Sequence, residues 1–349
     1  MPRIAPNAID VEGAKPELRL LLQAGSRLYM HFANATLAEF GEAGGMTIRK
    51  HLRDYGHWRG REMREAHNAL GLPITMETLN RCWDSASVFI IKGDIETKGR
   101  YTPFDVIYDV HDCPAADVWR AEGFHRWGHV YCDEFHQACA STYHPDGNVV
   151  IPINMMKGDD HCAFRWVMPS DARVIAPSPP SALGEKLAGY YRADSPSRAV
   201  YDAMVRTSRL IGGRFWTMVQ ALYALHPADR ADAVISAFLR SWGKQRGALA
   251  RERRLAAGHA LTAPHLLSGF DMAPDYVWDV AEPAVDAGSN HVKIIWTPLD
   301  EAWSDLGGHE LSERFWQESL PAFFAAYAPE TPVTLEHAAW RYAAALSAD

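Results

Sequence analysis

The sequence contains the stretch Arg53-Asp54-Tyr55-Gly56-His57-Trp58-Arg59-Gly60, and 187 residues later it contains Arg240-Ser241-Trp242-Gly243-Lys244-Gln245-Arg246-Gly247. Both stretches fit the pattern R-x-aromatic-G-x-x-R-G, which fixes four identities in eight positions. Trp83-Asp84 and Phe270-Asp271 are separated by the same interval. A repeat at a fixed spacing indicates that the chain contains two related halves.

Each half continues in the same order, with an apolar run typical of a strand, a long helical stretch and a second strand. The strand-like runs are 104–110 and 148–155 in the first half, and 291–298 and 332–337 in the second. We therefore predict an α+β fold of two tandem halves, each a small β-sheet packed by helices, arranged as a pseudo-dimer. The predicted boundaries are 15–168 for the half that carries the site, 169–198 for a Pro- and Ser-rich linker, and 199–349 for a degenerate half.

The composition excludes several classes of protein. The chain has 349 residues, a formal net charge of −8, no long basic run and five cysteines. Nucleic-acid binding depends on basic residues that neutralise phosphates, so we expect no nucleic-acid partner. No stretch is apolar and long enough for a membrane span, and the first residues lack the apolar core of a secretion signal. We expect a cytoplasmic protein with reduced thiols, a small-molecule substrate and no membrane partner; homo-oligomers stay open.

Reactive side chains gather on one predicted helix of the first half. Four of them recur at intervals of four, three and four residues and so share one helix face: His125, His129, Cys132 and His136. Asp133 lies beside this stripe. An offset of 184 residues aligns Cys132 with Trp316 and Asp133 with Gln317. The stripe is thus confined to the first half, which is why we place the site there.

Three readings of this stripe remain open. In the first, Cys132 is a nucleophile, His129 or His136 accepts its proton, Asp133 is an acid–base partner, and no cofactor is needed. In the second, a hydrolase or lyase holds a divalent metal such as zinc and uses the metal to activate water; the candidate ligands are His125, His129, Asp133 and His136. In the third, the pocket binds a small ligand without catalysis.

Other residues are candidates for the same pocket. Cys162 begins a strand after the turn Gly158-Asp159-Asp160 and completes the catalytic set. We expect four residues to contact the substrate: His125, Arg59, His57 and Trp58. Arginine suits a substrate carboxylate because its guanidinium can bind both oxygens. The recurrence of the arginine pattern in the second half, however, favours a structural role for Arg59. The other three cysteines (Cys82, Cys113 and Cys139) are expected in the core.

Two motifs in this region occur in a fixed order. Cys132-Asp133 on the predicted helix is followed by a proline-bearing turn and a strand, and then by the Gly158-Asp159 turn and Cys162-Ala163-Phe164. Over Val106 to Trp166 the chain thereby resembles the L-2-amino-thiazoline-4-carboxylic acid hydrolase family. The resemblance implies a hydrolase that opens a small cyclic C–N substrate, such as a thiazoline, an amidine or a lactam. In the family's type reaction, a thiazoline amino acid gives S-carbamoyl-cysteine.

Overall fold

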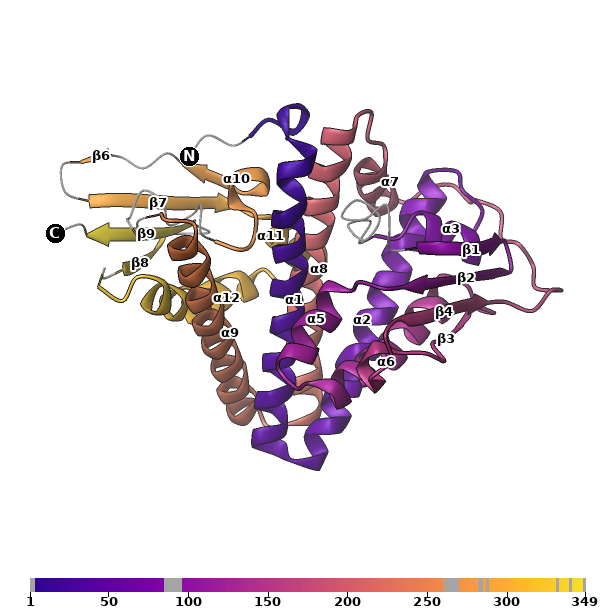
Figure 1. Cartoon of the computed structure of the whole chain (residues 1–349), viewed down its shortest axis with the longest axis horizontal. Helices are drawn as coiled ribbons and strands as arrows, with labels where there is room; N and C mark the ends of the chain where they lie inside the picture. The colour runs from indigo at the N-terminus through magenta and orange to yellow at the C-terminus, as the bar shows by residue number, and fades with distance from the viewer. Residues whose placement is uncertain are drawn as a thin grey trace.

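The computed structural model describes residues 4–84, 96–259, 261, 270–281, 285–286, 289–330, 333–338 and 341–347. It has the predicted α+β fold, with long helices and two antiparallel sheets. Figure 1 shows the two sheets at opposite ends of the molecule, with the long helices between them. None of the described helices is long and apolar enough to cross a membrane.

In the residues that the structure describes, the first half contains five α-helices and a four-stranded sheet. Its helices are α1 (Val11–Phe40), α2 (Glu42–Ala69), α3 (Met76–Arg81), α5 (Pro114–Ala121) and α6 (His125–Tyr143). The sheet has the order β1-β2-β4-β3 and consists of β1 (Glu96–Thr102), β2 (Asp105–Val110), β3 (Asn148–Val150) and β4 (Cys162–Val167). The strand expected over 148–155 is therefore shorter than predicted, because the short 3-10 helix η2 (Met155–Lys157) begins before β4.

The second half repeats this order of elements. Its helices are α8 (Pro196–Leu225), α9 (Ala228–Ala256), α10 (Pro274–Val277), α11 (Pro298–Asp305) and α12 (Glu310–Tyr327). Its strands are β5 (Asp279–Ala281), β6 (Val285–Asp286), β7 (Ser289–Trp296), β8 (Val333–Ala338) and β9 (Arg341–Ser347). The sheet order β5-β7-β9-β8 matches that of the first half, with β6 as an addition beside β7.

The repeated sequence pattern fixes the second helix of each half to the long helix that follows. A Cβ atom on Gly56 or Gly60 would lie 2.5 Å from the carbonyl oxygen of Phe135 or Cys139 on α6. Cβ atoms on Gly243 and Gly247 would be even closer to carbonyl oxygens of α12. Only glycine allows backbones to approach this closely. The pattern thus selects a tight pair of helices, α2 with α6 and α9 with α12.

The arginines of the pattern form matching ion pairs in the two halves. Arg53 donates to Glu134 on α6 and Arg240 donates to Glu318 on α12, in both cases at the surface. The second arginines are buried with aspartates, Arg59 with Asp84 and Arg246 with Asp271. Because both halves repeat these pairs, the arginine pattern is part of the scaffold.

The first helix of each half packs against the second helix of the other half. Helix α1 lies along α8 and α9, and α8 also lies along α2, as Figure 1 shows. The Tyr55 hydroxyl donates to the Leu210 carbonyl (3.3 Å), and the Trp242 indole donates to the Ala24 carbonyl (2.9 Å). The buried apolar residues of both halves form one core cluster. A common origin of the halves and their pseudo-dimeric relation stay predictions.

The predicted linker is an ordered part of the first half's surface. It contains α7 (Ala182–Ala188) and the 3-10 turn η3 (Gly189–Tyr191), and α8 begins before it ends. Ser181 caps α7 by accepting a hydrogen bond from the Gly184 amide. Helix α7 packs on α2, with Leu187 and Ala188 buried. The boundaries at 168 and 199 stay predictions.

Candidate functional site

A cavity of about 180 Å³ lies in the first half. Helices α1, α2, α5 and α6 and the sheet form most of its wall, and α8 of the second half closes it. Aromatic rings line it: Tyr55, Trp83, Tyr108, Trp119, Tyr131, Phe135, Phe164 and Trp166. A cavity of about 150 Å³ can hold benzene, so this one is large enough for a molecule with one small ring. Apolar walls with a few polar groups are typical of a small-molecule site.

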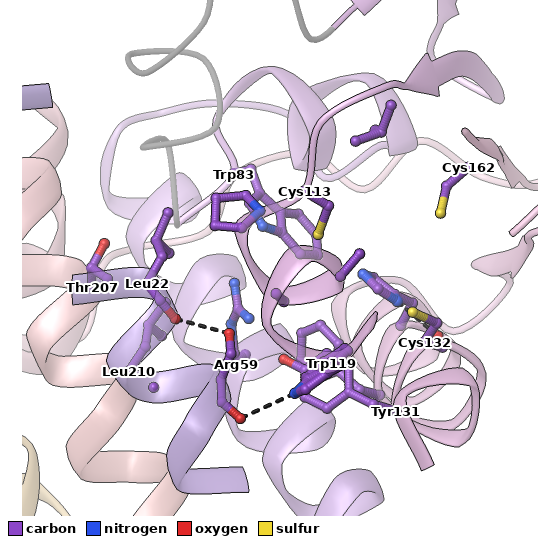
Figure 2. Close-up of a pocket in the computed structure, with 18 of the residues that line it drawn as sticks. Leu22, Arg59, Trp83, Cys113, Trp119, Tyr131, Cys132, Cys162, Thr207 and Leu210 are labelled. Atoms are coloured by element: carbon purple, nitrogen blue, oxygen red, sulfur yellow. Dashed lines mark hydrogen bonds between the residues drawn. The ribbon is translucent and has the colours of Figure 1, made fainter. Parts of the chain in front are cut away.

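Three thiols reach this cavity. Cys113, Cys132 and Cys162 line it, and Figure 2 shows Cys132 and Cys162 on the side away from Thr207 and Leu210. Burial raises the pKa of the Cys132 thiol well above its usual value, and the neighbouring Cys162 and Cys113 raise it further. Burial also raises the pKa of Cys162 to about 12. The side chains of Cys132 and Cys162 are therefore neutral thiols near pH 7. Cys113, expected in the core, is an addition to the site.

His136 presents a proton acceptor to the same cavity. Its Nδ1 lies 2.7 Å from the Cys132 carbonyl oxygen, one turn earlier on α6. A carbonyl only accepts, so Nδ1 carries the proton and Nε2 carries the lone pair. Rings pack around the imidazole, including Trp83 and Phe164. Burial lowers the pKa of His136 to about 4, which keeps the ring neutral near pH 7.

Asn154 places an uncommitted donor beside the thiols. Its Oδ1 accepts from the Met156 amide (2.8 Å), which fixes the side-chain amide, while its buried Nδ2 has no acceptor among the described residues. The same side chain lies near enough to Cys132 to lower the pKa of that thiol, against the larger effect of burial. Negative charge that develops at Sγ would find this donor in place.

The rest of the predicted stripe points elsewhere. His125 and Asp133 are exposed, and His129 Nε2 lies 3.2 Å from Asp133 Oδ2. None of the three lines the cavity, although Cys132 and Asp133 both border a more open depression next to β3. A helix rises about 1.5 Å per residue, so His125 and His136 are roughly 16 Å apart along α6 and cannot serve one small site.

The alternative metal site is not assembled in the described part of the chain. No group of three or more His, Cys, Asp or Glu side chains there is placed to hold a metal ion. Of the four candidate ligands, His136 faces the cavity, His129 lies beside Asp133, and His125 faces solvent. Whether the protein needs a cofactor stays a prediction.

The three predicted substrate contacts from α2 have different places. The Arg59 guanidinium reaches the cavity wall but is held by Asp84, with Nε 2.7 Å from Oδ2. His57 is at the surface and bonds Thr142 (2.6 Å), and Trp58 is buried against Gly213. His57 and Trp58 do not line the cavity.

The sequence reasoning missed the contribution of α8. Thr207, Leu210, Ile211 and Arg214 line the cavity from the second half. One signal was available: Arg214 is a charged residue in the otherwise apolar run 210–216. Asn154 was missed as well, and only its position before the Gly158 turn pointed to it.

Comparison with known proteins gives one match. Residues 24–166 match the family model described as L-2-amino-thiazoline-4-carboxylic acid hydrolase. The matched segment runs from α1 to β4 and includes the thiols and His136, but it ends before α8. No curated protein and no solved structure matches the chain.

Proposed function

We propose that this chain, whose residues 24–166 match the L-2-amino-thiazoline-4-carboxylic acid hydrolase family model, opens a small cyclic C–N substrate by hydrolysis in the cavity. Cys132 is the nucleophile and His136 is the proton carrier. One observation supports this assignment above all: a thiol and an imidazole with a fixed tautomer line the same apolar, ring-sized cavity. A nucleophile and a base within one closed site are the parts that acyl-type hydrolysis requires.

The reaction proceeds in two halves. As Cys132 Sγ bonds to the electrophilic ring carbon, its proton moves to His136 Nε2. The ring C–N bond then breaks, and the departing nitrogen takes that proton from His136. Water next attacks the same carbon and gives a proton to His136, the S–C bond breaks, and the proton returns to Sγ. One water is consumed, and the product is the ring-opened carbonyl compound.

The protonation states define how the nucleophile is activated. Burial raises the pKa of Cys132 and lowers that of His136 to about 4, so the resting pair is neutral. The proton therefore moves during the attack, and no thiolate–imidazolium pair forms beforehand. Asp133 is exposed and outside the cavity. We therefore assign the acid step at the leaving nitrogen to His136 in place of Asp133.

Replacement of Cys132 is the main test. We expect Cys132→Ala to lower kcat/KM on 2-amino-thiazoline-4-carboxylate by about 10³-fold or more, as for other covalent nucleophiles. His136→Gln should lower it by roughly 10²–10⁴-fold, the range for general acid–base groups. Cys82→Ala is the matched control, because Cys82 is partly buried and does not line the cavity. Steady-state kinetics with a folding check by circular dichroism measures all three.

Three outcomes would contradict the proposal. Full turnover by Cys132→Ala would show that Cys132 is not the nucleophile. Turnover that disappears on chelation and returns with zinc would favour the metal hydrolase. Intact-mass analysis during turnover adds a positive test. A covalent adduct on Cys132 that is absent from Cys132→Ser is expected. Tight ligand binding with no product from thiazoline, amidine or lactam substrates would instead indicate a non-catalytic binding protein.

A further inference from the structure

We propose that Arg214, which α8 of the second half supplies, binds a carboxylate on the ligand that occupies the cavity. The ligand class is then small-ring carboxylates, and the second half is part of the binding site. The inference rests on the proposed function in one respect, namely that the cavity is the site. It concerns a residue in the part of the chain beyond the family match.

Arg214 is a buried guanidinium with donors to spare. Its side chain lines the cavity, and the residue is 9% exposed. One terminal nitrogen donates to the Gly25 carbonyl and the other to the Tyr131 hydroxyl (2.8 Å). These bonds use two of the five N–H groups of an arginine. The buried Nε has no acceptor among the described residues.

The charge of Arg214 is not neutralised by the described part of the chain. Its polar contacts there are the Gly25 carbonyl and the phenols of Tyr131 and Tyr55, whose rings its guanidinium also contacts, and none of these groups is a carboxylate. The nearby Arg59 adds a second positive charge, and Asp84 is the carboxylate bound to Arg59. A buried cation without a counter-ion is costly, so the cavity favours an anionic occupant.

Other buried arginines of this protein show the contrast. Arg209, on the same helix, reaches three carboxylates: Glu62, Glu301 and Asp305. Arg246 is held by Asp271. The fold thus provides carboxylate partners for these two buried guanidinium groups, whereas the buried Arg206 donates to backbone carbonyls. At Arg214 the corresponding space is the cavity.

A second polar atom on α8 lies on the same face. Thr207, Leu210, Ile211 and Arg214 are spaced three and four residues apart, so one stripe of α8 faces the cavity. The Thr207 hydroxyl oxygen is buried and has no partner in the described structure. In Figure 2 Thr207 and Leu210 lie across the pocket from Cys132 and Cys162. A ligand carboxylate at α8 and an electrophilic carbon at the thiols would use both ends of the cavity.

The test compares an acid with its decarboxylated partner. Isothermal titration calorimetry on Cys132→Ala, which prevents turnover, uses 2-oxothiazolidine-4-carboxylate and thiazolidin-2-one, which has the same ring and is uncharged near pH 7. A charge-assisted hydrogen-bond pair corresponds to roughly a 10–100-fold change in Kd. We expect the acid to bind that much more tightly than the neutral partner. Adding Arg214→Gln should remove this preference and leave the Kd of the neutral compound unchanged.

Arg27→Gln is the matched control. Arg27 precedes Arg214 by 187 residues, lies on α1, and has a buried Nε without a partner among the described residues, but it lies near Asp271 and Arg246 of the second half. It should leave the preference for the acid intact. Arg214→Lys, tested in place of Arg214→Gln, keeps a positive charge but loses the planar guanidinium group. It should therefore retain part of the preference for the acid.

Several results would overturn the inference. They are equal binding of the acid and the neutral compound by Cys132→Ala alone, no binding of any ring carboxylate, or an acid preference that survives Arg214→Gln. The first comparison requires no change at Arg214, so a misfolded variant does not block the test. Binding does not depend on turnover. An acid preference without any hydrolysis would therefore support Arg214 and contradict only the proposed function.

Discussion

The two halves of this molecule share the same order of helices and strands, but their interiors are packed differently. In the first half, Cys132 and His136 border the cavity. At the matching positions of the second half, Trp316 and Leu320 are buried, and Trp316 packs edge-on against Trp278 with centroids 5.3 Å apart. The glycine contacts and the arginine pairs around these positions are the same in both halves.

The comparison separates residues that build the fold from residues that build the site. The R-x-aromatic-G-x-x-R-G pattern occurs in both halves and joins helices. The thiols and the imidazole occur in the first half, where they border the cavity. A few side chains on α6 thus determine whether the interior is hollow or filled, as expected when function resides in a site carried by a fold.

The largest effect should come from exchanging the two interiors at one position. We expect Cys132→Trp to fill the cavity and reduce ligand binding and turnover below detection, while overpacking costs about 1–3 kcal/mol of stability. The reciprocal change Trp316→Cys should leave kcat/KM unchanged and cost about 3–5 kcal/mol, because it opens a hole in a filled core. Calorimetric binding, kinetics and urea denaturation measure these effects. Wild-type turnover by Cys132→Trp would show that the reaction does not use this cavity.

The next effect concerns the buried ion pairs. Asp84→Asn and Asp271→Asn each leave an arginine buried without its carboxylate, which should cost about 3–5 kcal/mol in either half. Only Asp84→Asn should also alter ligand binding, because only Arg59 borders the cavity. Urea denaturation and titration of the acid probe separate the two effects. Equal loss of binding in both variants would mean that the halves transmit strain to each other more strongly than the geometry suggests.

The smallest effect is a difference in acid stability. Burial lowers the pKa of His67 and His136 to about 4, and that of His51 well below its usual value. Their neutral forms are favoured in the folded state, so this contribution to stability is present above about pH 6.5 and lost as the pH falls toward 4. Arg254 and Leu320 of the second half occupy the positions that match His67 and His136.

Hydrogen exchange at stepped pH can locate this loss. We expect amides of α2 and α6 to lose protection before those of α9 and α12 as the pH falls from 6.5 to about 4.5. Replacement of His67 by Gln should reduce the slope of unfolding free energy against pH in this window. Earlier exposure of α9 and α12 would assign acid sensitivity to the carboxylates of the second half.

Much of the scaffold could be predicted from the sequence, because it depends on local signals. Gly56 and Gly60 recur with their arginines at a fixed spacing, which predicted two related halves, and each copy of the pattern lies in a tight pair of helices. The helix carrying Cys132 and the strand beginning at Cys162 were also predicted, and the cavity brings both thiols together. A helical face is a local property, and periodicity is sufficient to find it.

The composition of the site could not be predicted in the same way. Helical spacing placed His125 and His129 on the face of Cys132, but a face is a long stripe and a small cavity uses only part of it. Arg214 reaches the cavity because α8 packs across α2, a contact between segments far apart in sequence. No periodic pattern encodes such a contact. The unusual charge within the run 210–216 was the one local sign of it.

The packing of α8 against the first half also affects the order in which the cavity is completed during translation. Tyr131 and Arg214 bond across a separation of 83 residues, so the ribosome adds Arg214 several seconds after Tyr131 at about 5–20 residues per second. Once Cys162 has been added, the nascent chain has its thiols and its imidazole but still lacks α8. The reactive end of the pocket is therefore translated first, and the wall that excludes water arrives later. The apolar surface that α8 later covers is therefore a binding site that a chaperone of nascent chains could use until α8 is in place.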